Sequence, residues 1–420
     1  MHILIVADHA WINGGQAKVA IESVLGLARR GHQVTFLAAV GEPDPRLAMA
    51  GIEVIALGQY DVDTAPSGMH FLPQYIWNRK AARVLRESIA RMDAADSVVH
   101  VHAFAKAVSP SIGSVLAKSP VPAVYTMHEF FLVCPTGGFY DYRAALPCHR
   151  KPLSASCIVR HCDSRSYAHK LLRVGRQALI NHGGLHAAFK HIIMISELQH
   201  QAARPYLSDA VSYHRVDNPL DITDPGPKER PGRDFLFVGR LSGEKGIEHF
   251  CEAARQAGVE AVITSDGPMA DDPKARYPQA RFLGWQSPEQ VLALLCDARA
   301  LVFPSVWYGG QPLTVYEALA MGTPVIVSDV CAGREAVVDG RNGYWFKSAD
   351  AEDLARALRK VRDDDTAAAV TRAAHADYWA SPLTLQRHLD AIEGVYETML
   401  GRGGQTRPVE TANVEEALAG

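Results

Sequence analysis

FPSVWYGGQPLTVYEALAMGTPVIVSD, residues 303–329, contains the end of one apolar strand, a Gly-Gly loop, an amphipathic helix and a second apolar strand. Pro312 fits the first turn of that helix, where its missing N–H removes no hydrogen bond. Gly322 and Pro324 then end the helix, and PVIVSD is typical of a buried parallel strand. This order of elements indicates an α/β fold in which a loop leads into a helix N-terminus.

The start of this helix predicts a binding site. Free backbone amides and the positive end of the helix dipole attract an anion or sugar hydroxyls, so we expect the amides of residues 309–313 to hold such groups. Glu317 lies further along the helix among apolar neighbours. A carboxylate beside a buried face needs hydrogen-bond donors, which ribose hydroxyls can supply, but a solvated helix glutamate fits the same pattern.

Both halves of the chain begin alike, with a strand, a turn and a helix at 2–30 and again at 235–257. Further apolar strands follow, and helical patterns separate most of them. This predicts two doubly wound parallel α/β domains, with ligands bound in a cleft between two facing sheets. The further strands are expected at 34–38, 54–57, 98–101, 123–126, 192–195, 261–264, 300–303, 324–327 and 344–346.

Composition shifts along the chain suggest the segment boundaries. NPLDITDPGPKERPG is rich in proline, glycine and charge, as expected of a linker, and the last residues are small and polar, as expected of a disordered tail. Leucines and other apolar residues recur at helical spacing just before that tail. We therefore expect an N-terminal domain at 1–217, a linker at 218–232, a C-terminal domain at 233–380, a helix at 381–400 and a tail at 401–420.

The overall composition is that of a globular protein. Hydrophobic residues make up 48%, charged residues 21%, and the net charge is −3, which gives no bias toward polyanions such as nucleic acid. No apolar run approaches the ~20 residues of a membrane-spanning helix, and MHILIVADHA is interpreted as a first strand rather than a signal peptide. Seven cysteines, an odd number without an export signal, favour a reducing cytoplasm.

Two cations flank a small loop just past a strand. Arg240 and Lys245 stand at opposite ends of RLSGEK. Arginine can bind two phosphate oxygens and lysine supplies a point charge, which is suitable for a diphosphate, although two solvated surface cations fit equally. Gly14 and Gly15 follow the first strand and allow backbone to approach a phosphate or an acceptor, and Gly267 lies in a turn after another strand.

Histidines end two of the expected strands. His128 follows AVYTM, so it is expected at the edge of a sheet and facing the cleft. His100 and His102 occupy an earlier strand end, where His102 is expected on the acceptor side and His100 in the core.

Together these motifs resemble the large retaining glycosyltransferase family usually numbered four, over about residues 1–400. Glu317 and the Ala, Gly and Pro-Val after it match the second half of the family's nucleotide-sugar signature, in which two glutamates flank seven residues. GRLSGEKG, residues 239–246, matches the family pattern G-R-L-x-x-x-K-G. TMHEFFLVCP, residues 126–135, is similar to a family string that has His-Asp where this chain has His128 and Glu129.

The resemblance implies the GT-B fold, with two Rossmann-like domains facing a central cleft and a C-terminal helix that crosses back to the N-terminal domain. It implies that Glu317 binds the donor ribose, that Arg240 and Lys245 hold the donor diphosphate, and that His128 contacts the donor sugar or the reaction centre. With the loop patterns, it places further donor contacts at Gly14, Gly15, Gly267, Gly309, Gly310, Gln311, Pro312, Leu313 and Thr314.

The function expected from the resemblance is a retaining glycosyltransferase of the hexosyltransferase class. It would move a sugar from a nucleotide-diphosphate sugar to a saccharide or lipid-linked saccharide in polysaccharide or glycoconjugate biosynthesis. Because cations in the loop would neutralise the leaving diphosphate, no metal or other cofactor is required. No covalent protein nucleophile is assigned.

Gly309 departs from the family pattern, which has its first glutamate there. The missing glutamate leaves an alternative hypothesis open, in which the protein is a non-catalytic subunit that binds a sugar nucleotide. Gln311 offers a neutral hydrogen-bonding replacement for the missing carboxylate, which favours an active enzyme with altered donor preference. A third reading is an epimerase or phosphorylase of the same fold, for which no acid/base or pyridoxal-binding residues can be singled out.

An insertion at about 134–190 carries two further patterns. Four cysteines could bind zinc, although no pair has C-x-x-C spacing, and reduced structural thiols are the alternative. Cations interleaved with apolar residues from 143 to 190 indicate either a solvated helix face or a surface for anionic lipid headgroups. The second reading predicts a cytoplasmic protein, peripheral at the inner face of a membrane. The four cysteines are Cys134, Cys148, Cys157 and Cys162.

Overall fold

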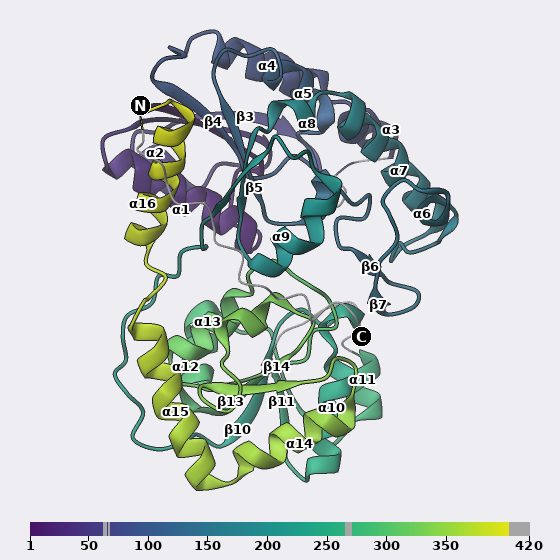
Figure 1. Cartoon of the computed structure of the whole chain (residues 1–420), viewed down its shortest axis with the longest axis vertical. Coiled ribbons are helices and arrows are strands. Elements are labelled where there is room, and N and C mark those ends of the chain that lie inside the picture. The colour runs from purple at the N-terminus through teal and green to yellow at the C-terminus, as the bar shows by residue number, and fades with distance from the viewer. Residues whose placement is uncertain (62–64, 66–67, 265–270, 403–420) are drawn as a thin grey trace.

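The computed structural model describes residues 1–61, 65, 68–264 and 271–402. In this part of the chain two parallel sheets form, one in each half, and the two halves stack along the long axis of the molecule (Figure 1). Two doubly wound α/β domains are therefore confirmed. The predicted tail beyond Arg402 and the turn at Gly267 lie outside the described residues.

The N-terminal sheet contains seven described strands, and every pair of neighbours is parallel. The order is β3-β2-β1-β4-β5-β8-β9, so the direction of winding reverses between β1 and β4. In such sheets ligands bind beyond the carboxyl ends of the strands near that reversal. The strands are β1 (His2–His9), β2 (Gln33–Val40), β3 (Glu53–Gln59), β4 (Ser97–Val101), β5 (Ala123–Met127), β8 (His191–Met194) and β9 (Ser212–Arg215).

The C-terminal sheet contains six described strands in the order β12-β11-β10-β13-β14-β15, again all parallel, and its winding reverses between β10 and β13. A short antiparallel hairpin, β6 (Tyr140–Asp141) with β7 (Leu146–Pro147), lies in the insertion. The strands of the C-terminal sheet are β10 (Asp234–Val238), β11 (Ala261–Thr264), β12 (Arg281–Gly284), β13 (Ala298–Phe303), β14 (Val325–Ser328) and β15 (Gly343–Phe346).

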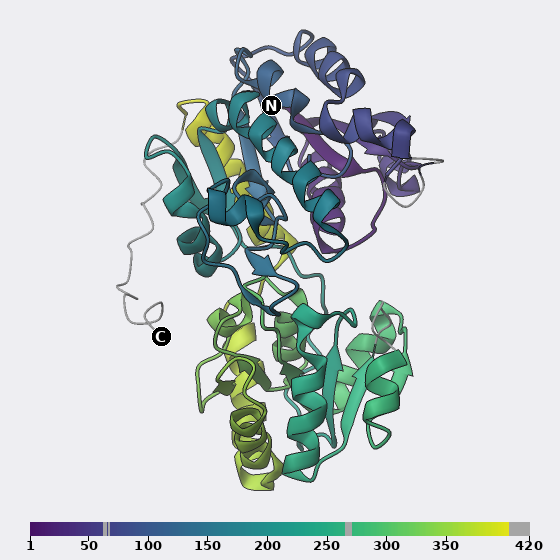
Figure 2. The same ribbon diagram turned by 90° about the vertical axis from the view of Figure 1, so that its right-hand side faces the viewer.

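Helices cover both faces of each sheet, which explains the continuous apolar runs in the central strands (Figure 2). Residues 3–6 of β1, for example, have no exposed surface. The N-terminal half contains α1 (Gly15–Arg29), α2 (Pro45–Met49), α3 (Gly68–Ile76), α4 (Arg79–Ile89), α5 (Gly113–Leu116), α6 (Ala155–Val159), α7 (Tyr167–His182), α8 (Leu185–Ala188) and α9 (Glu197–Ala203). The C-terminal half contains α10 (Ile247–Ala257), α11 (Asp271–Arg276), α12 (Pro288–Asp297), α13 (Leu313–Ala320), α14 (Ala351–Arg362), α15 (Asp364–Trp379) and α16 (Leu385–Met399).

The last helix, α16, packs on the N-terminal domain beside α1 (Figure 1). Leu389, Ile392 and Val395 join the hydrophobic core that contains the first strand. The hydroxyl of Tyr396 lies 2.6 Å from Nδ1 of His100, inside that core. The chain therefore passes between the domains twice, and α16 completes the hydrophobic core around β1.

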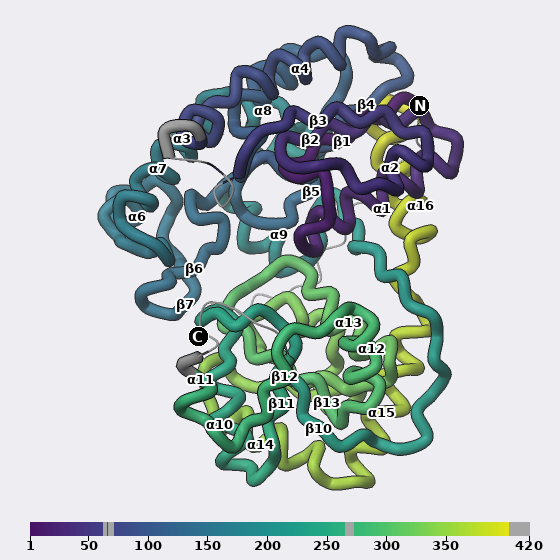
Figure 3. Tube along the Cα trace, turned by 180° about the vertical axis from the view of Figure 1, so that it is seen from behind, coloured from purple at the N-terminus to yellow at the C-terminus, as the bar shows by residue number. Residues whose placement is uncertain are grey.

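The two connections run side by side (Figure 3). Residues 216–233, between β9 and β10, form neither helix nor strand, and the N–H of Leu220 donates to the carbonyl of Leu383 at 2.6 Å. His388 of α16 makes two hydrogen bonds. Its Nδ1 donates to the carbonyl of Asp217 at 2.8 Å, and its Nε2 lies 3.0 Å from the hydroxyl of Ser23. These bonds join both connections to α1. None of the described helices is long and apolar enough to cross a membrane.

Candidate active site between the two domains

One cavity of about 390 Å³ is lined by loops of both domains. The N-terminal domain contributes the start of α1 and the end of β5, and the C-terminal domain contributes the loop after β13 and the start of α13. Of the residues predicted to form the site, the structure brings together Gly15, His128, Lys245, Gly309, Gly310, Gln311, Pro312, Leu313 and Thr314. Gly14 caps α1 one residue before this lining.

The two glycines before α13 play different roles. Gly309 has a φ of 66°, and nothing lies within 4 Å of where a Cβ would stand. A Cβ on Gly310 would lie 2.8 Å from Cδ1 of Ile195 and 3.0 Å from the carbonyl oxygen of His128. Gly309 is therefore required by its left-handed backbone, and Gly310 by the close approach of the two domains.

Pro312 precedes the helix rather than occupying its first turn, because α13 begins at Leu313. Gln311, beside it, bonds to the interdomain connection: its Oε1 accepts the N–H of Asn218 at 2.6 Å, and its Nε2 donates to Asp217 at 3.0 Å. The side chain of Tyr316 also hydrogen-bonds Gln311, so little of the capacity of this amide is left for a ligand. Gln311 thus ties the helix start to the connection between domains, a role that the sequence did not suggest.

Lys245 presents a cation to the cavity. Its ammonium lies 5.1 Å from the centre of the Trp307 ring, and it forms no ion pair within the described chain. Burial lowers the pKa of Lys245, and the nearby Glu244 opposes that shift. A partly desolvated ammonium between aromatic rings is stabilised by any anion that enters.

Arg240 does not line this cavity with Lys245. It is exposed, and it lines two neighbouring cavities of about 830 Å³ and about 530 Å³. Its guanidinium is thus placed at the border between the C-terminal loop and the N-terminal domain.

Glu317 lies one turn into α13 and is half-buried. Burial raises its pKa, and the ammonium of Lys18 in α1 opposes that shift. No hydrogen bond to its carboxylate occurs within the described residues, and the cavity of 390 Å³ does not include it. Glu317 is therefore a desolvated carboxylate facing the other domain, close to the donor loop but outside its lining.

His128 is held by a second histidine. Its Nε2 lies 3.1 Å from Nδ1 of His102, the rings are stacked, and both side chains are buried. Burial lowers the pKa of His128 to about 3, so the imidazole is neutral. His102 has no exposed surface and supports His128 from behind, and it lines a small cavity with His9, Asn13 and Lys106. His100 lies in the core between Tyr396 and Thr126, as predicted.

Glu129 is a further functional candidate, although in the sequence it stands out only as the residue that replaces the Asp of the family string. It lines the same cavity as His128, and burial raises the pKa of its carboxyl. In the sequence, the indication of a functional role was its position beside His128 at the end of β5. A carboxyl at a strand end is common, however, and this position alone does not show that Glu129 lines a cavity between the domains.

The insertion does not form a zinc site in the structure. No group of three or more His, Cys, Asp or Glu side chains arranged to hold a metal ion occurs among the described residues. The buried Lys170 lies among the thiols instead, with Nζ 3.5 Å from Sγ of Cys157. The basic surface is also smaller than the sequence suggested, because Lys170 and Arg176 are buried.

The chain matches two family models, the Glycosyl transferase 4-like domain at residues 14–218 and Glycosyl transferases group 1 at residues 232–364. A glycogen synthase of Mycobacterium tuberculosis is 32% identical over 193 residues, which cover 43% of this chain and 46% of the relative. A phosphatidyl-myo-inositol mannosyltransferase of Mycolicibacterium smegmatis is 30% identical over 234 residues, which cover 50% of this chain and 57% of that protein. The chain thus spans about half the length of these curated relatives.

Among solved structures, HepE of Anabaena in complex with UDP and glucose has a similar fold. The TM-score is 0.64 at 16% identity, and the match covers 95% of this chain and 100% of that chain. At this identity the likeness shows the arrangement of the two domains.

Proposed function

The chain belongs to the GT-B glycosyltransferases, and we propose that it is a retaining enzyme that moves a sugar from a nucleotide-diphosphate sugar to a saccharide or lipid-linked saccharide. One observation carries the proposal. The N-terminus of α13, the ammonium of Lys245 and the imidazole of His128 line a single cavity, although they come from opposite domains. A sugar between the domains would contact all three.

The donor diphosphate fits the C-terminal side of this cavity. Lys245 is a partly desolvated cation without an acidic partner in the described chain, and free amides at the start of α13 add the positive end of a helix. Glu317 would accept hydrogen bonds from the ribose hydroxyls, which would satisfy a carboxylate that has no donor among the described residues. As the bond to the sugar breaks, negative charge grows on the diphosphate, and Lys245 and Arg240 would stabilise it.

His128 would contact the donor sugar from the N-terminal side. Because its Nε2 faces His102, its Nδ1 is the ring atom left for a sugar hydroxyl. A neutral imidazole can donate or accept one hydrogen bond there without repelling a cationic reaction centre.

A lipid-linked acceptor is supported by the name of the mycobacterial mannosyltransferase, which contains phosphatidyl-myo-inositol. A cytoplasmic place at the inner face of a membrane follows as a proposal from such an acceptor. The exposed cations of the insertion, such as Lys151, Arg165 and Lys190, would contribute to membrane contact.

A screen of nucleotides and nucleotide sugars for thermal stabilisation tests the proposal. A ligand at about a hundred times its dissociation constant adds ~2.7 kcal/mol to stability, so the parent protein should melt later with at least one of them. The same donor should then be consumed when a competent acceptor extract is added. Absence of any stabilisation would remove the donor site, whereas stabilisation without transfer from any donor would identify a non-catalytic sugar-nucleotide-binding subunit.

A further inference from the structure

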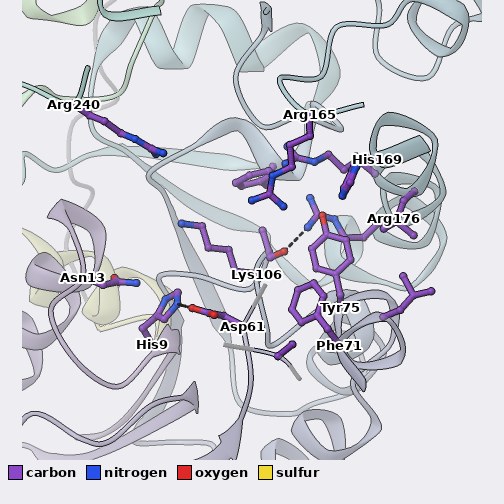
Figure 4. Close-up of a pocket in the computed structure, with 16 residues that line it drawn as sticks. His9, Asn13, Asp61, Phe71, Tyr75, Lys106, Arg165, His169, Arg176 and Arg240 are labelled. Atoms are coloured by element: carbon purple, nitrogen blue, oxygen red, sulfur yellow. Dashed lines mark hydrogen bonds and ion pairs between the residues drawn. The ribbon is translucent and has the colours of Figure 1, made fainter. Parts of the chain in front are cut away.

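A cavity of about 830 Å³ lies beside the proposed donor site and mostly in the N-terminal domain (Figure 4). Its walls come from the loop after β1, from α3, from the loop after β4 and from α7, and Arg240 is its contribution from the C-terminal domain. The donor site uses none of these elements except the loop of Arg240, so this cavity is the space left for an acceptor.

Positive charge dominates the lining. Among the described residues that line the cavity, only Asp61 carries a carboxylate, and that carboxylate lies 3.3 Å from Nε2 of His9. Arg173 is paired with Asp163 at 3.1 Å, but the other cations form no ion pair within the described chain. The cations that line the cavity are Lys106, Arg165, Arg173, Arg176 and Arg240.

Arg176 distinguishes this cavity from a solvated basic surface, because its cationic side chain is buried. Its side chain is 1% exposed, and its guanidinium lies between two rings, 4.6 Å from the centre of Tyr75 and 5.1 Å from that of Phe131. Nη1 donates to the carbonyl of Ala105. Nε and Nη2 are buried and have no partner among the described residues.

No acid among the described residues forms an ion pair with this arginine. Asp8 lies nearby, but its carboxylate accepts the N–H groups of residues 106–108. Glu129 also lies nearby, and it forms no ion pair with Arg176 in the described chain. A buried charge with two unmade hydrogen bonds costs several kcal/mol, and an anion in the cavity would remove that cost.

We propose that this cavity binds a phosphoryl group of the acceptor, with Arg176 and Lys106 as its principal contacts, an inference that rests on the proposed transferase function. The planar fork of arginine matches two phosphoryl oxygens, and lysine adds a point charge. Three cations of the N-terminal domain have no acidic partner in the described chain, and they suit the double charge of a phosphate or diphosphate better than the single charge of a carboxylate: Lys106, Arg165 and Arg176. The neighbouring Phe71 and Leu72 provide an apolar wall for the group that carries the phosphate.

Calorimetry on the protein tests the site, with pyrophosphate, glucose 1-phosphate and farnesyl diphosphate as phosphoryl probes and glucuronate as a carboxylate for comparison. UDP at saturation keeps these probes out of the donor site. Arg176→Met keeps the apolar volume of the side chain but removes the fork, and Lys106→Gln alters an exposed side chain that the fold does not need. Arg83→Gln, on the exposed face of α4 and outside the cavity lining, is the matched control.

We expect phosphoryl probes to bind the parent protein and the Arg83→Gln control equally, and to bind both cavity variants about tenfold or more weakly. Tighter binding of farnesyl diphosphate than of glucose 1-phosphate would assign the phosphoryl group to a lipid, and the reverse order to a soluble sugar phosphate. Equal binding to all variants, or tighter binding of glucuronate than of any phosphoryl probe, would overturn the proposal. If Arg176→Met does not fold, Lys106→Gln alone decides.

Two controls separate this inference from the proposed function. UDP should bind Arg176→Met as it binds the parent, because Arg176 does not line the donor cavity. If no nucleotide binds the parent protein, the proposed function fails, and the phosphoryl measurement is repeated without nucleotide with the same criteria. If nucleotide binds but no phosphoryl probe does, the anion site alone is wrong.

Discussion

Nε2 of His128 lies 3.1 Å from Nδ1 of His102, so the imidazole at the cleft is supported by a second imidazole with no exposed surface. One ring donates and the other accepts, which requires an unprotonated nitrogen on the accepting ring, and burial lowers the pKa of both histidines. A proton added to either ring would break the bond or place a charge in the core. The histidine at the cleft is therefore a hydrogen-bonding group at all pH values near neutrality.

The pH dependence of stability follows from this pair. The pKa of His128 is lowered to about 3 from an ordinary value near 6.5, so the unfolded chain binds a proton in that window and the folded chain does not. Stability is therefore fully present above about pH 6.5 and is lost as the pH falls toward 3, by up to roughly 1.4 kcal/mol per pH unit for this group. Melting curves of the parent protein and His128→Gln between pH 7 and 4 would show it. The variant should have the shallower slope, while His182→Gln, at an exposed position, should match the parent; equal slopes in all three would contradict the assignment.

Replacing Glu317 by alanine should weaken nucleotide binding by about 1–3 kcal/mol, through loss of charged hydrogen bonds to the ribose. Calorimetry with UDP and GDP measures the change. Glu317→Gln keeps the shape but can make only weaker bonds, so its affinity should lie between those of the parent and Glu317→Ala. Affinity that is unchanged for every nucleotide would show that this carboxylate has another role.

Lys245→Met and Arg240→Met should both lower turnover more than stability, because both cations act on charge that develops at the departing diphosphate. Because Lys245 and Arg240 line different cavities, the two variants should differ in UDP binding. Lys245→Met should also weaken UDP binding, since its ammonium lines the donor cavity, whereas Arg240→Met should leave UDP binding closer to the parent value. Normal turnover per folded molecule in either variant would indicate a structural role for that residue.

The neighbouring glycines before α13 should respond oppositely to a new side chain. Gly309 has open space around it, so Gly309→Glu should fold at a cost of about 1–2 kcal/mol for its left-handed backbone and should change donor preference. Gly310→Ala places a methyl group against Ile195 and the backbone of His128, so it should push the domains apart and reduce turnover with every donor. Melting curves with turnover across several donors test both. If the parent transfers no sugar and Gly309→Glu does, the natural chain is a degenerate transferase.

The central strands of both sheets could be predicted because they are buried on both faces and therefore consist of continuous apolar residues. Two strands of the large parallel sheets were missed, Ser212–Arg215 and Arg281–Gly284. Each lies at the edge of its sheet, is partly exposed, and mixes polar with apolar residues. No periodic signal marks such a strand, because its pairing depends on the neighbour rather than on its own composition.

The candidate site could be predicted where short motifs carry it, as in the loop before α13 and the position of Lys245. Contacts between distant segments could not be predicted. The bond of Gln311 to Asn218 joins residues 93 positions apart, and the pairing of His102 with His128 joins two strands. Arg176 was predicted on a solvated or membrane-facing surface, because nothing in its own helix shows that Tyr75 and Phe131 enclose it.

The packing of α16 on α1 has a consequence for biosynthesis. The core around the first strand includes Leu389, Ile392 and Val395, which are translated after the strands of both sheets. While the ribosome is still making the chain, the first domain must wait with an uncovered apolar face, although the second domain is already complete. Chaperones that shield nascent chains should therefore associate with this protein until α16 has been made, and a chain cut before residue 385 should aggregate.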